Sequence, residues 1–212
     1  MSTEASGMRE GRMRELRERI AALEWTRQEG GVELFTQRAR EAGCVVVDCS
    51  AGEADSWLRE HLRGKERIAA SADALLTALG IDRVLAESGA NVSAATEGGT
   101  EEVRGLSGAD LGITVALAGI AASGSLLCAV SPDEHRSVSL LPDEHVVFLD
   151  VARIVPSLHQ TATLLRRLAV DDARSAVTLI GGPSKTADIE KVLVTGVHGP
   201  GTLTIVLVRS SV

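Results

Sequence analysis

Aromatic residues are scarce in this chain of 212 residues: they make up 2% of it, and tyrosine is absent. Aromatic surfaces on which nucleic-acid bases stack are therefore hard to build. Basic residues are also in deficit, because 22 Lys and Arg stand against 29 Asp and Glu and give a formal net charge of -7. Nucleic-acid binding needs concentrated positive charge, so the composition argues against a nucleic-acid partner.

Cysteines and long apolar runs are few as well. Cys44, Cys49 and Cys128 show no CxxC spacing and are too few for a four-cysteine iron–sulfur site within one chain. No apolar run approaches the roughly 20 residues that span a bilayer, and the N-terminus has no signal-peptide core. We therefore expect a cytoplasmic protein with reduced thiols, without a membrane span and without a cofactor of its own.

The remaining composition is that of an ordinary globular protein, with 44% hydrophobic and 24% charged residues. Residues 1–31 stand apart, because a charge-rich stretch is followed by a glycine pair at its end. Its apolar residues recur at helical spacing: Met13, Leu16, Ile20 and Leu23. We predict an amphipathic arm that packs on the main domain, residues 32–212, or on a second copy, which leaves a homo-oligomer open. A solvated helix that frays at the terminus explains the pattern equally well.

Short helices and apolar strands alternate through the main domain. The helices that we predict are 32–42, 54–63, 72–79, 157–168 and 186–193. The strands that we predict are 44–48, 67–70, 83–86, 111–115, 124–130, 145–150, 177–180 and 202–208, with a long loop at 88–105. This alternation predicts an α/β fold with a mixed, mostly parallel sheet flanked by helices. The stretch 124–150 lacks a helix of normal length, so we expect antiparallel pairing there.

The densest group of polar side chains, residues 181–190, lies between the last two predicted strands. Gly182 permits a tight turn with exposed N–H groups, and Ser184 or Thr186 can cap the helix predicted to follow. Free N–H groups at a helix start, together with Lys185, suit a carboxylate or a phosphate. The segment therefore predicts a small-anion site, although a well-capped helix without a ligand explains the same residues.

Groups able to transfer protons lie in and after this segment. Asp188 and Glu190 place two negative charges near the predicted helix start, which disfavours a phosphate. His198, followed by Gly199, precedes the last strand and can act as an acid, a base or a ligand donor. A ring that only satisfies local backbone groups is the alternative for His198. We take His198, Lys185, Asp188 and Glu190 as catalytic candidates, and His198 and Gly199 also as ligand contacts.

A third candidate is the small-residue turn Ser123, Gly124 and Ser125. Such a turn lets the backbone approach a ligand closely, and a bulge entering a buried strand is the alternative. The repeated Asp-Glu-His triplets within 132–135 and 142–145 raise the question of a metal. Adjacent residues on a strand point to opposite faces, so one triplet rarely chelates an ion, and we expect no metal site.

Four motifs occur in the order of those of a known family. They are GIT at 112–114 with IAASGSL at 120–126, LLPDEHVV at 140–147, GGPSKTADIE at 181–190 and GVHGP at 196–200. Across about residues 107–208 the chain resembles the lactate utilization protein C family, whose members are single LUD domains. The resemblance implies the fold shared by glucosamine-phosphate deaminase, ribose-phosphate isomerase and CoA transferases.

The resemblance also implies a function. It implies an accessory subunit of a system that oxidises L-lactate to pyruvate, beside partner subunits that carry iron–sulfur clusters. Such a subunit would bind a small carboxylate or its partners. Because the fold hosts many chemistries, an independent enzyme that acts on a sugar phosphate or a CoA thioester is the alternative.

One position departs from the family pattern. The family's IAETGT carries a glutamate where this chain has Ala122. Loss of an essential acid or base typically costs about 10²–10⁴ in rate. The departure therefore makes catalysis at this turn less expected and favours a binding or regulatory role, or a diverged substrate. Ser123 and Ser125 keep hydroxyl groups there.

Overall fold

The computed structural model describes residues 30–94, 106, 108–129, 136–162, 164–166, 177–187, 193–196 and 198–209. The predicted arm lies outside this part of the chain except for residues 30 and 31, and so do the catalytic candidates Asp188 and Glu190. Within the described residues, no helix has the length and apolar character needed to cross a membrane.

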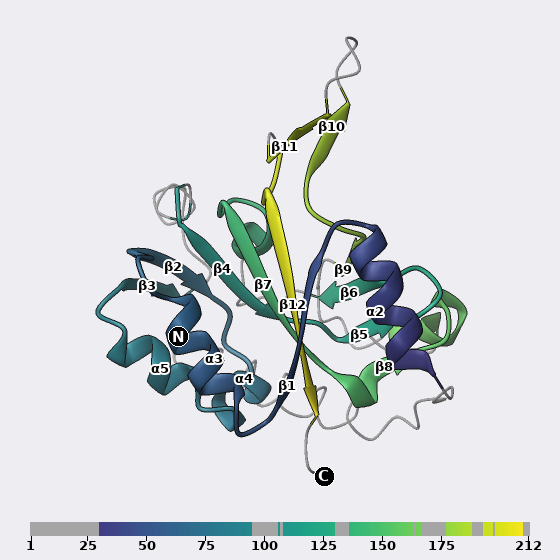
Figure 1. Cartoon of the computed structure of the whole chain (residues 1–212), viewed down its shortest axis with the longest axis horizontal. Coiled ribbons are helices and arrows are strands. Elements are labelled where there is room, and N and C mark those ends of the chain that lie inside the picture. Colours follow the sequence, from purple (N-terminus) through teal and green to yellow (C-terminus); the bar gives the residue numbers. More distant parts are fainter. Residues whose placement is uncertain are drawn as a thin grey trace, which may run out of the picture.

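A six-stranded sheet forms the centre of the molecule (Figure 1), and all of its strand pairings are parallel. The strand order is β1-β12-β7-β4-β2-β3. The strands are β1 (Val45–Ser50), β2 (Arg67–Ala70), β3 (Asn91–Ala94), β4 (Leu111–Val115), β7 (Glu144–Asp150) and β12 (Thr202–Arg209). The predicted α/β class with a mostly parallel sheet is confirmed.

Two smaller sheets accompany the main sheet. The four-stranded one has the order β8-β5-β6-β9 and contains β5 (Ala118–Ile120), β6 (Ser125–Ala129), β8 (Ile154–Val155) and β9 (Val177–Ile180). Its strand β6 pairs antiparallel with β5 and β9, so the antiparallel pairing expected within 124–150 occurs in a separate sheet. The two-stranded one is a hairpin of β10 (Lys185–Ala187) and β11 (Leu193–Thr195).

Helices pack against the sheets, and the main sheet separates two large clusters of the hydrophobic core. The helices are α2 (Gly31–Glu41), α3 (Ala54–His61), α4 (Ala74–Ala78) and α5 (Ile81–Glu87), with 3-10 turns η1 (Arg136–Ser139), η2 (Val151–Arg153) and η3 (Leu158–Thr161). Val146 and Phe148 of β7 pack in one cluster with residues of α3, α4 and α5. Val147 and Leu149 belong to a second cluster with Phe35 of α2 and residues of the four-stranded sheet. Side chains alternate along a strand, so a strand buried on both faces reads as one apolar run.

Three predicted elements are wrong. Residues 83–86 belong to α5, where Ile81, Val84 and Leu85 are buried at helical spacing; a run of four apolar residues cannot distinguish helix from strand. Residues 91–94, predicted as loop, form β3 through parallel pairing with β2. The helix predicted at 186–193 is replaced by the hairpin.

The hairpin has a local cause. The β-branched residues Thr186, Val194 and Thr195 favour strands, and eight residues are too few to establish a helical period. Consequently the helix start that was expected to present free N–H groups near Lys185 does not exist, because Lys185 begins β10.

Candidate functional site

Three of the motif segments, around 140–143, 184 and 196–201, meet at the amino ends of β7 and β12 (Figure 1). The backbone N–H of Ser184 donates to the carbonyl oxygen of Pro200 at 2.9 Å, and that of Gly196 donates to the carbonyl of Ser184 at 3.1 Å. A Cβ placed on Gly199 would lie 3.4 Å from the Cβ of Ser184 and 3.9 Å from the carbonyl oxygen of Leu140. Segments far apart in the sequence are therefore neighbours here.

The turn at 123–125 joins this neighbourhood through β6 and β9. Ser125 is buried, and its Oγ would lie 3.6 Å from a Cβ on Gly181. Gly124 has a left-handed φ of 66°, and a Cβ there would lie 2.2 Å from the backbone nitrogen of Ala39 in α2. The close backbone approach predicted for a ligand is thus made at Gly124 to helix α2.

Lys185 and Gly182 both lie against the C-terminal end of α2. The Lys185 Nζ donates to the carbonyl oxygen of Ala42 at 2.6 Å, and a Cβ on Gly182 would lie 3.0 Å from the same oxygen. The last carbonyls of a helix lack intrahelical partners and carry partial negative charge, so an ammonium group stabilises them. Lys185 therefore has a structural partner, with which an anion must compete.

His198 is exposed in the turn that contains Gly199 and Pro200. Because Ser184 donates to Pro200, the structure brings the His198 turn and the Ser184 segment together. Thr186 lies in β10, one residue beyond Lys185. Ligand binding and proton transfer by these residues stay predictions.

A buried pair that we did not predict lies beneath η1. The Nε2 of His145 and the Oγ1 of Thr114 are 2.8 Å apart, and His145 is 1% exposed. Burial lowers the pKa of His145 to about 3, so the ring is neutral near pH 7. A Cβ on Gly112 would lie 2.1 Å from the carbonyl oxygen of Val138, which shows how closely η1 covers this face. The signal available in the sequence was that Thr114 and His145 both lie in family-like motifs.

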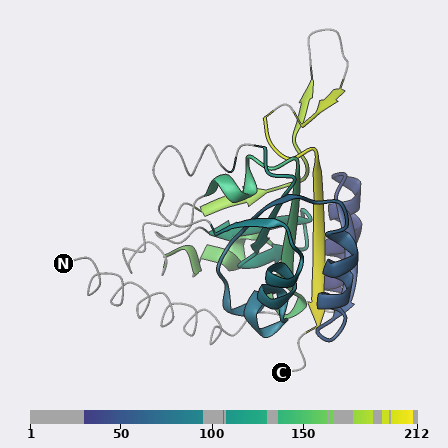
Figure 2. The same ribbon diagram turned by 90° about the vertical axis from the view of Figure 1, so that its left-hand side faces the viewer.

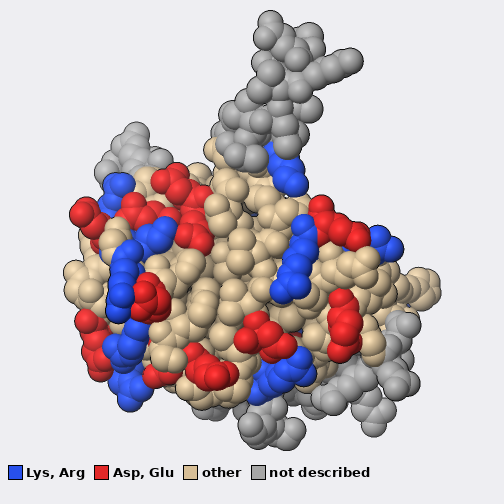
Figure 3. Space-filling model, in the orientation of Figure 1, with Lys and Arg blue, Asp and Glu red and all other residues tan. Residues whose placement is uncertain are grey.

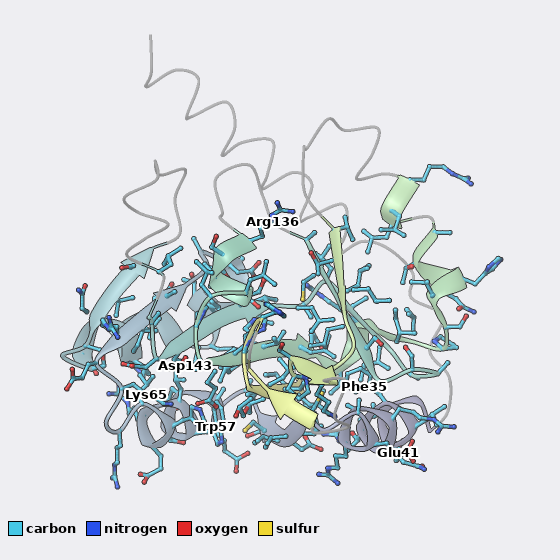
Figure 4. All side chains as sticks on the ribbon, turned by 90° about the horizontal axis from the view of Figure 1, so that it is seen from above. Phe35, Glu41, Trp57, Lys65, Arg136 and Asp143 are labelled. Atoms are coloured by element: carbon cyan, nitrogen blue, oxygen red, sulfur yellow. The ribbon has the colours of Figure 1, made fainter. Side chains whose placement is uncertain are left out.

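A charged cluster occupies the opposite face of the main sheet. Glu144 accepts from Lys65 Nζ at 2.9 Å and from Thr204 Oγ1 at 3.3 Å, and its carboxylate lies 2.9 Å from His61 Nε2. Trp57 stacks on His61 with 4.7 Å between ring centroids. The hydrogen bond from His61, helped by Lys65, lowers the pKa of Glu144 to about 2. Figure 4 shows Trp57 and Lys65 on one side of the sheet and Arg136 of η1 on the other.

These contacts explain why the triplet at 142–145 is not a chelate: Glu144 and His145 serve opposite faces. The triplet at 132–135 lies outside the described residues. Among the residues that the structure describes, no group of three His, Cys, Asp or Glu is placed to hold a metal ion.

Comparison with known proteins places these motifs in a family. Residues 32–208 match the LUD domain. Lactate utilization protein C of Exiguobacterium sp. is 42% identical over 103 residues, which cover 48% of this chain and 45% of that protein. The uncharacterized protein YkgG of Escherichia coli is 34% identical over 158 residues, which cover 74% of this chain and 68% of that protein.

The match to several relatives is partial. In the Exiguobacterium protein, and in lactate utilization protein C of Bacillus licheniformis, it spans less than half of the relative's own length, at 45% and 43%. A crystal structure of a DUF162 family protein from Deinococcus radiodurans has a similar fold, with a TM-score of 0.60 at 20% identity. That likeness covers 85% of this chain and 97% of that one.

Proposed function

Because the chain belongs to the LUD domain family, and relatives of it are called lactate utilization protein C, we propose that it is an accessory subunit of a system that oxidises L-lactate to pyruvate. In this proposal the iron–sulfur clusters reside on partner subunits in the cytoplasm. This chain binds those partners and a small carboxylate. Ala122, exposed where the family-like motif has glutamate, supports binding rather than catalysis at that turn.

The observation that carries the proposal is the β10–β11 hairpin. Its strands belong to neither of the other sheets, and they stand clear of the rest of the described chain in Figures 1 and 2. A two-stranded hairpin is at best marginally stable by itself in water, so it gains stability by packing on another surface. Its base is anchored by the bonds from Lys185 to Ala42 and from Ser184 to Pro200. A firmly anchored, projecting hairpin supports contact with a partner protein.

The surface below the hairpin supports the same partner class. In Figure 3, basic and acidic side chains are interspersed on the visible face, and a band of uncharged surface runs down from the hairpin. Mixed charge around an uncharged band is typical of a protein–protein contact rather than of a polyanion site.

The test is co-purification from the native host with the tagged full chain. We expect iron–sulfur proteins, recognised by their visible absorbance, to accompany the chain. Replacing residues 187–193 by Asn-Gly keeps the pairs Lys185–Thr195 and Thr186–Val194 and closes them with a two-residue turn. This variant should lose the partners while its thermal unfolding midpoint is retained.

A matched control is Glu60→Ala in α3, which removes an exposed ion pair with Arg63, two residues beyond the helix, and should keep the partners. If the unmodified chain brings no iron–sulfur protein with it, the proposed function is wrong. Retention of the partners by the shortened hairpin would remove the hairpin from the docking surface.

The alternative function is an independent enzyme acting on a sugar phosphate or a CoA thioester. The helix start expected to hold a carboxylate or a phosphate is a β-strand at Lys185–Ala187, so this segment favours neither function over the other. A thermal-shift screen separates the two functions, because a ligand at a hundredfold its dissociation constant adds about 2.7 kcal/mol of stability. Lactate or pyruvate should stabilise the chain, whereas stabilisation by sugar phosphates or CoA alone would favour the enzyme.

A further inference from the structure

The His145–Thr114 pair leaves a hydrogen-bonding position open. A neutral imidazole has one nitrogen that donates and one that accepts. Thr114 serves Nε2, and no other described residue forms a hydrogen bond with the ring. The Nδ1 nitrogen of a ring that is 1% exposed therefore lacks a protein partner among the described residues. An unsatisfied buried polar group costs about 1–3 kcal/mol, and nearly all such groups in native proteins are paired with protein, water or ligand.

The face around this nitrogen differs from an ordinary core. Strand alternation places Gly112, Thr114 and His145 on one face of the main sheet. Ala69 of β2 continues that face and packs with Val138 of η1. The opposite face of the same strands is filled by large apolar side chains: Ile68, Leu111, Ile113 and Val146. A few converging polar groups among small and apolar residues are typical of a small-molecule site.

Resting on the proposed function, we propose that Nδ1 of His145 binds the C2 oxygen of a small 2-hydroxy or 2-oxo carboxylate, with Thr114 as its positioning residue. The threonine hydroxyl can donate or accept. When Thr114 accepts from Nε2–H, Nδ1 is an acceptor, and the hydroxyl of a 2-hydroxy acid donates a hydrogen bond to it. When Thr114 donates to Nε2, Nδ1 carries the hydrogen and binds the carbonyl oxygen of a 2-oxo acid. One pair of side chains can thus hold both the alcohol and the ketone.

The carboxylate of such a ligand should lie nearer the amino ends of the strands, because burying an unpaired charge is costly. His145 is the second residue of β7, and the carbonyl of the preceding Asp143 accepts from Gly201 N–H at 2.9 Å. The amino end of β7, beside His145, is therefore the end at which the motif segments meet. The Ser184 and His198 segments lie at this end, which connects the buried pair to the predicted ligand contacts.

The experiment is NMR of the full chain with ¹⁵N-labelled histidine, titrated with L-lactate and with pyruvate. His145→Gln identifies the His145 signals, and His159→Gln, which changes an exposed histidine on η3, is the matched control. We expect L-lactate to leave Nδ1 of His145 unprotonated and pyruvate to leave it protonated, with His159 unmoved. Thr114→Val, which keeps the shape and removes the hydroxyl, should weaken both affinities about tenfold, the equivalent of one lost hydrogen bond.

A histidine with only a structural role would lower stability when replaced but would show no change of tautomer with ligand. If the His145 signals of the unmodified chain stay fixed in tens-of-millimolar lactate and pyruvate, the proposal is overturned. Iron–sulfur partners that co-purify with such an unresponsive chain would leave the accessory-subunit function standing. Ligand-dependent signals in a chain that captures no partner would support the site and contradict that function.

Discussion

Glu144 and His145 are neighbours in β7, yet they face opposite sides of the main sheet and differ in how many hydrogen-bond partners they have. Glu144 has three side-chain partners, in His61, Lys65 and Thr204, whereas the described residues give His145 only Thr114. The Glu144 cluster joins the end of α3 and the following loop to two strands, and the Lys65 ammonium lies against the Glu144 carboxylate. The difference teaches that the fully paired group stabilises the fold, while the underpaired group is the position at which we propose that a ligand binds.

The two residues also keep their charge states for different reasons. Burial opposes charge on His145, whereas hydrogen bonds to His61 and Lys65 favour charge on Glu144. Both pKa values are lowered, so both residues make the free energy of unfolding fall on acidification, but in different ranges of pH. Acid titration of stability can therefore examine the two faces separately.

The largest expected effect comes from Gly112→Ala, which adds a methyl group on the face of the main sheet that carries His145. The new methyl would lie 2.1 Å from the backbone oxygen of Val138, so η1 must move. We expect a loss of about 3 kcal/mol in the free energy of unfolding, measured by urea denaturation, and displaced His145 signals. Gly52→Ala is the control, because its Cβ would meet nothing within 4 Å. Equal stability of the two variants would show that η1 does not cover this face closely.

The next effect is the acid sensitivity of His145. In the unfolded chain the imidazole has its ordinary pKa of 6.5, whereas in the folded chain its pKa is about 3. The unfolded state therefore takes up more protons, and stability is lost as pH falls from 6.5 toward 3. Between pH 7 and 5 we expect the wild type to lose about 2 kcal/mol more than His145→Gln.

This difference is read from urea midpoints of the two proteins at matched pH, with His159→Gln as the variant that should follow the wild type. Parallel curves for wild type and His145→Gln would mean that the ring is charged in the folded protein. The conclusion that His145 is buried in its neutral form would then be wrong.

On the other face, the acid sensitivity that Glu144 causes lies at lower pH, and Glu144→Gln should remove it. The folded pKa is about 2 against an ordinary value of 4.5, so the stabilisation by Glu144 is present above 4.5 and is lost as pH falls toward 2. Because the cluster is partly exposed and screened by solvent, we expect only about 1 kcal/mol of this loss between pH 5 and 3. Between pH 5 and 3 the free energy of unfolding of Glu144→Gln should fall less steeply than that of the wild type. Between pH 7 and 5 the two curves should have the same slope. A change confined to the higher range would reverse the assignment of the two faces.

Most strands of the main sheet could be predicted because parallel strands buried on both faces appear as continuous apolar runs. The predicted strands at 111–115 and 145–150 match β4 and β7 almost residue for residue. The elements at 83–86 and 186–193 were wrong because short segments carry too little periodicity, and pairing with distant residues decides their state. Strand β3 likewise depends on its pairing with β2.

The site divides in the same way. The motif segments around Ser184, His198 and Ser125 were located by composition, since glycine and small polar residues mark turns. The bond between Thr114 and His145 was not, because 31 residues separate them and only strand register brings them together. Whether two polar residues of neighbouring strands share a face follows from that register.

The smallest expected effect on stability comes from Lys185, which belongs neither to the Glu144 cluster nor to the His145–Thr114 pair. Its Nζ donates to the Ala42 carbonyl at the end of α2, and the side chain is exposed, so Lys185→Ala should cost about 0.5–1 kcal/mol in urea denaturation. Arg63→Ala, which removes an exposed ion pair with Glu60, is the control and should change stability less. We also expect Lys185→Ala to weaken the binding of L-lactate, because the ammonium group is the cation nearest in sequence to the motif turn at 181–184. An unchanged dissociation constant with the expected loss of stability would limit Lys185 to capping the helix and leave His145 to hold the ligand.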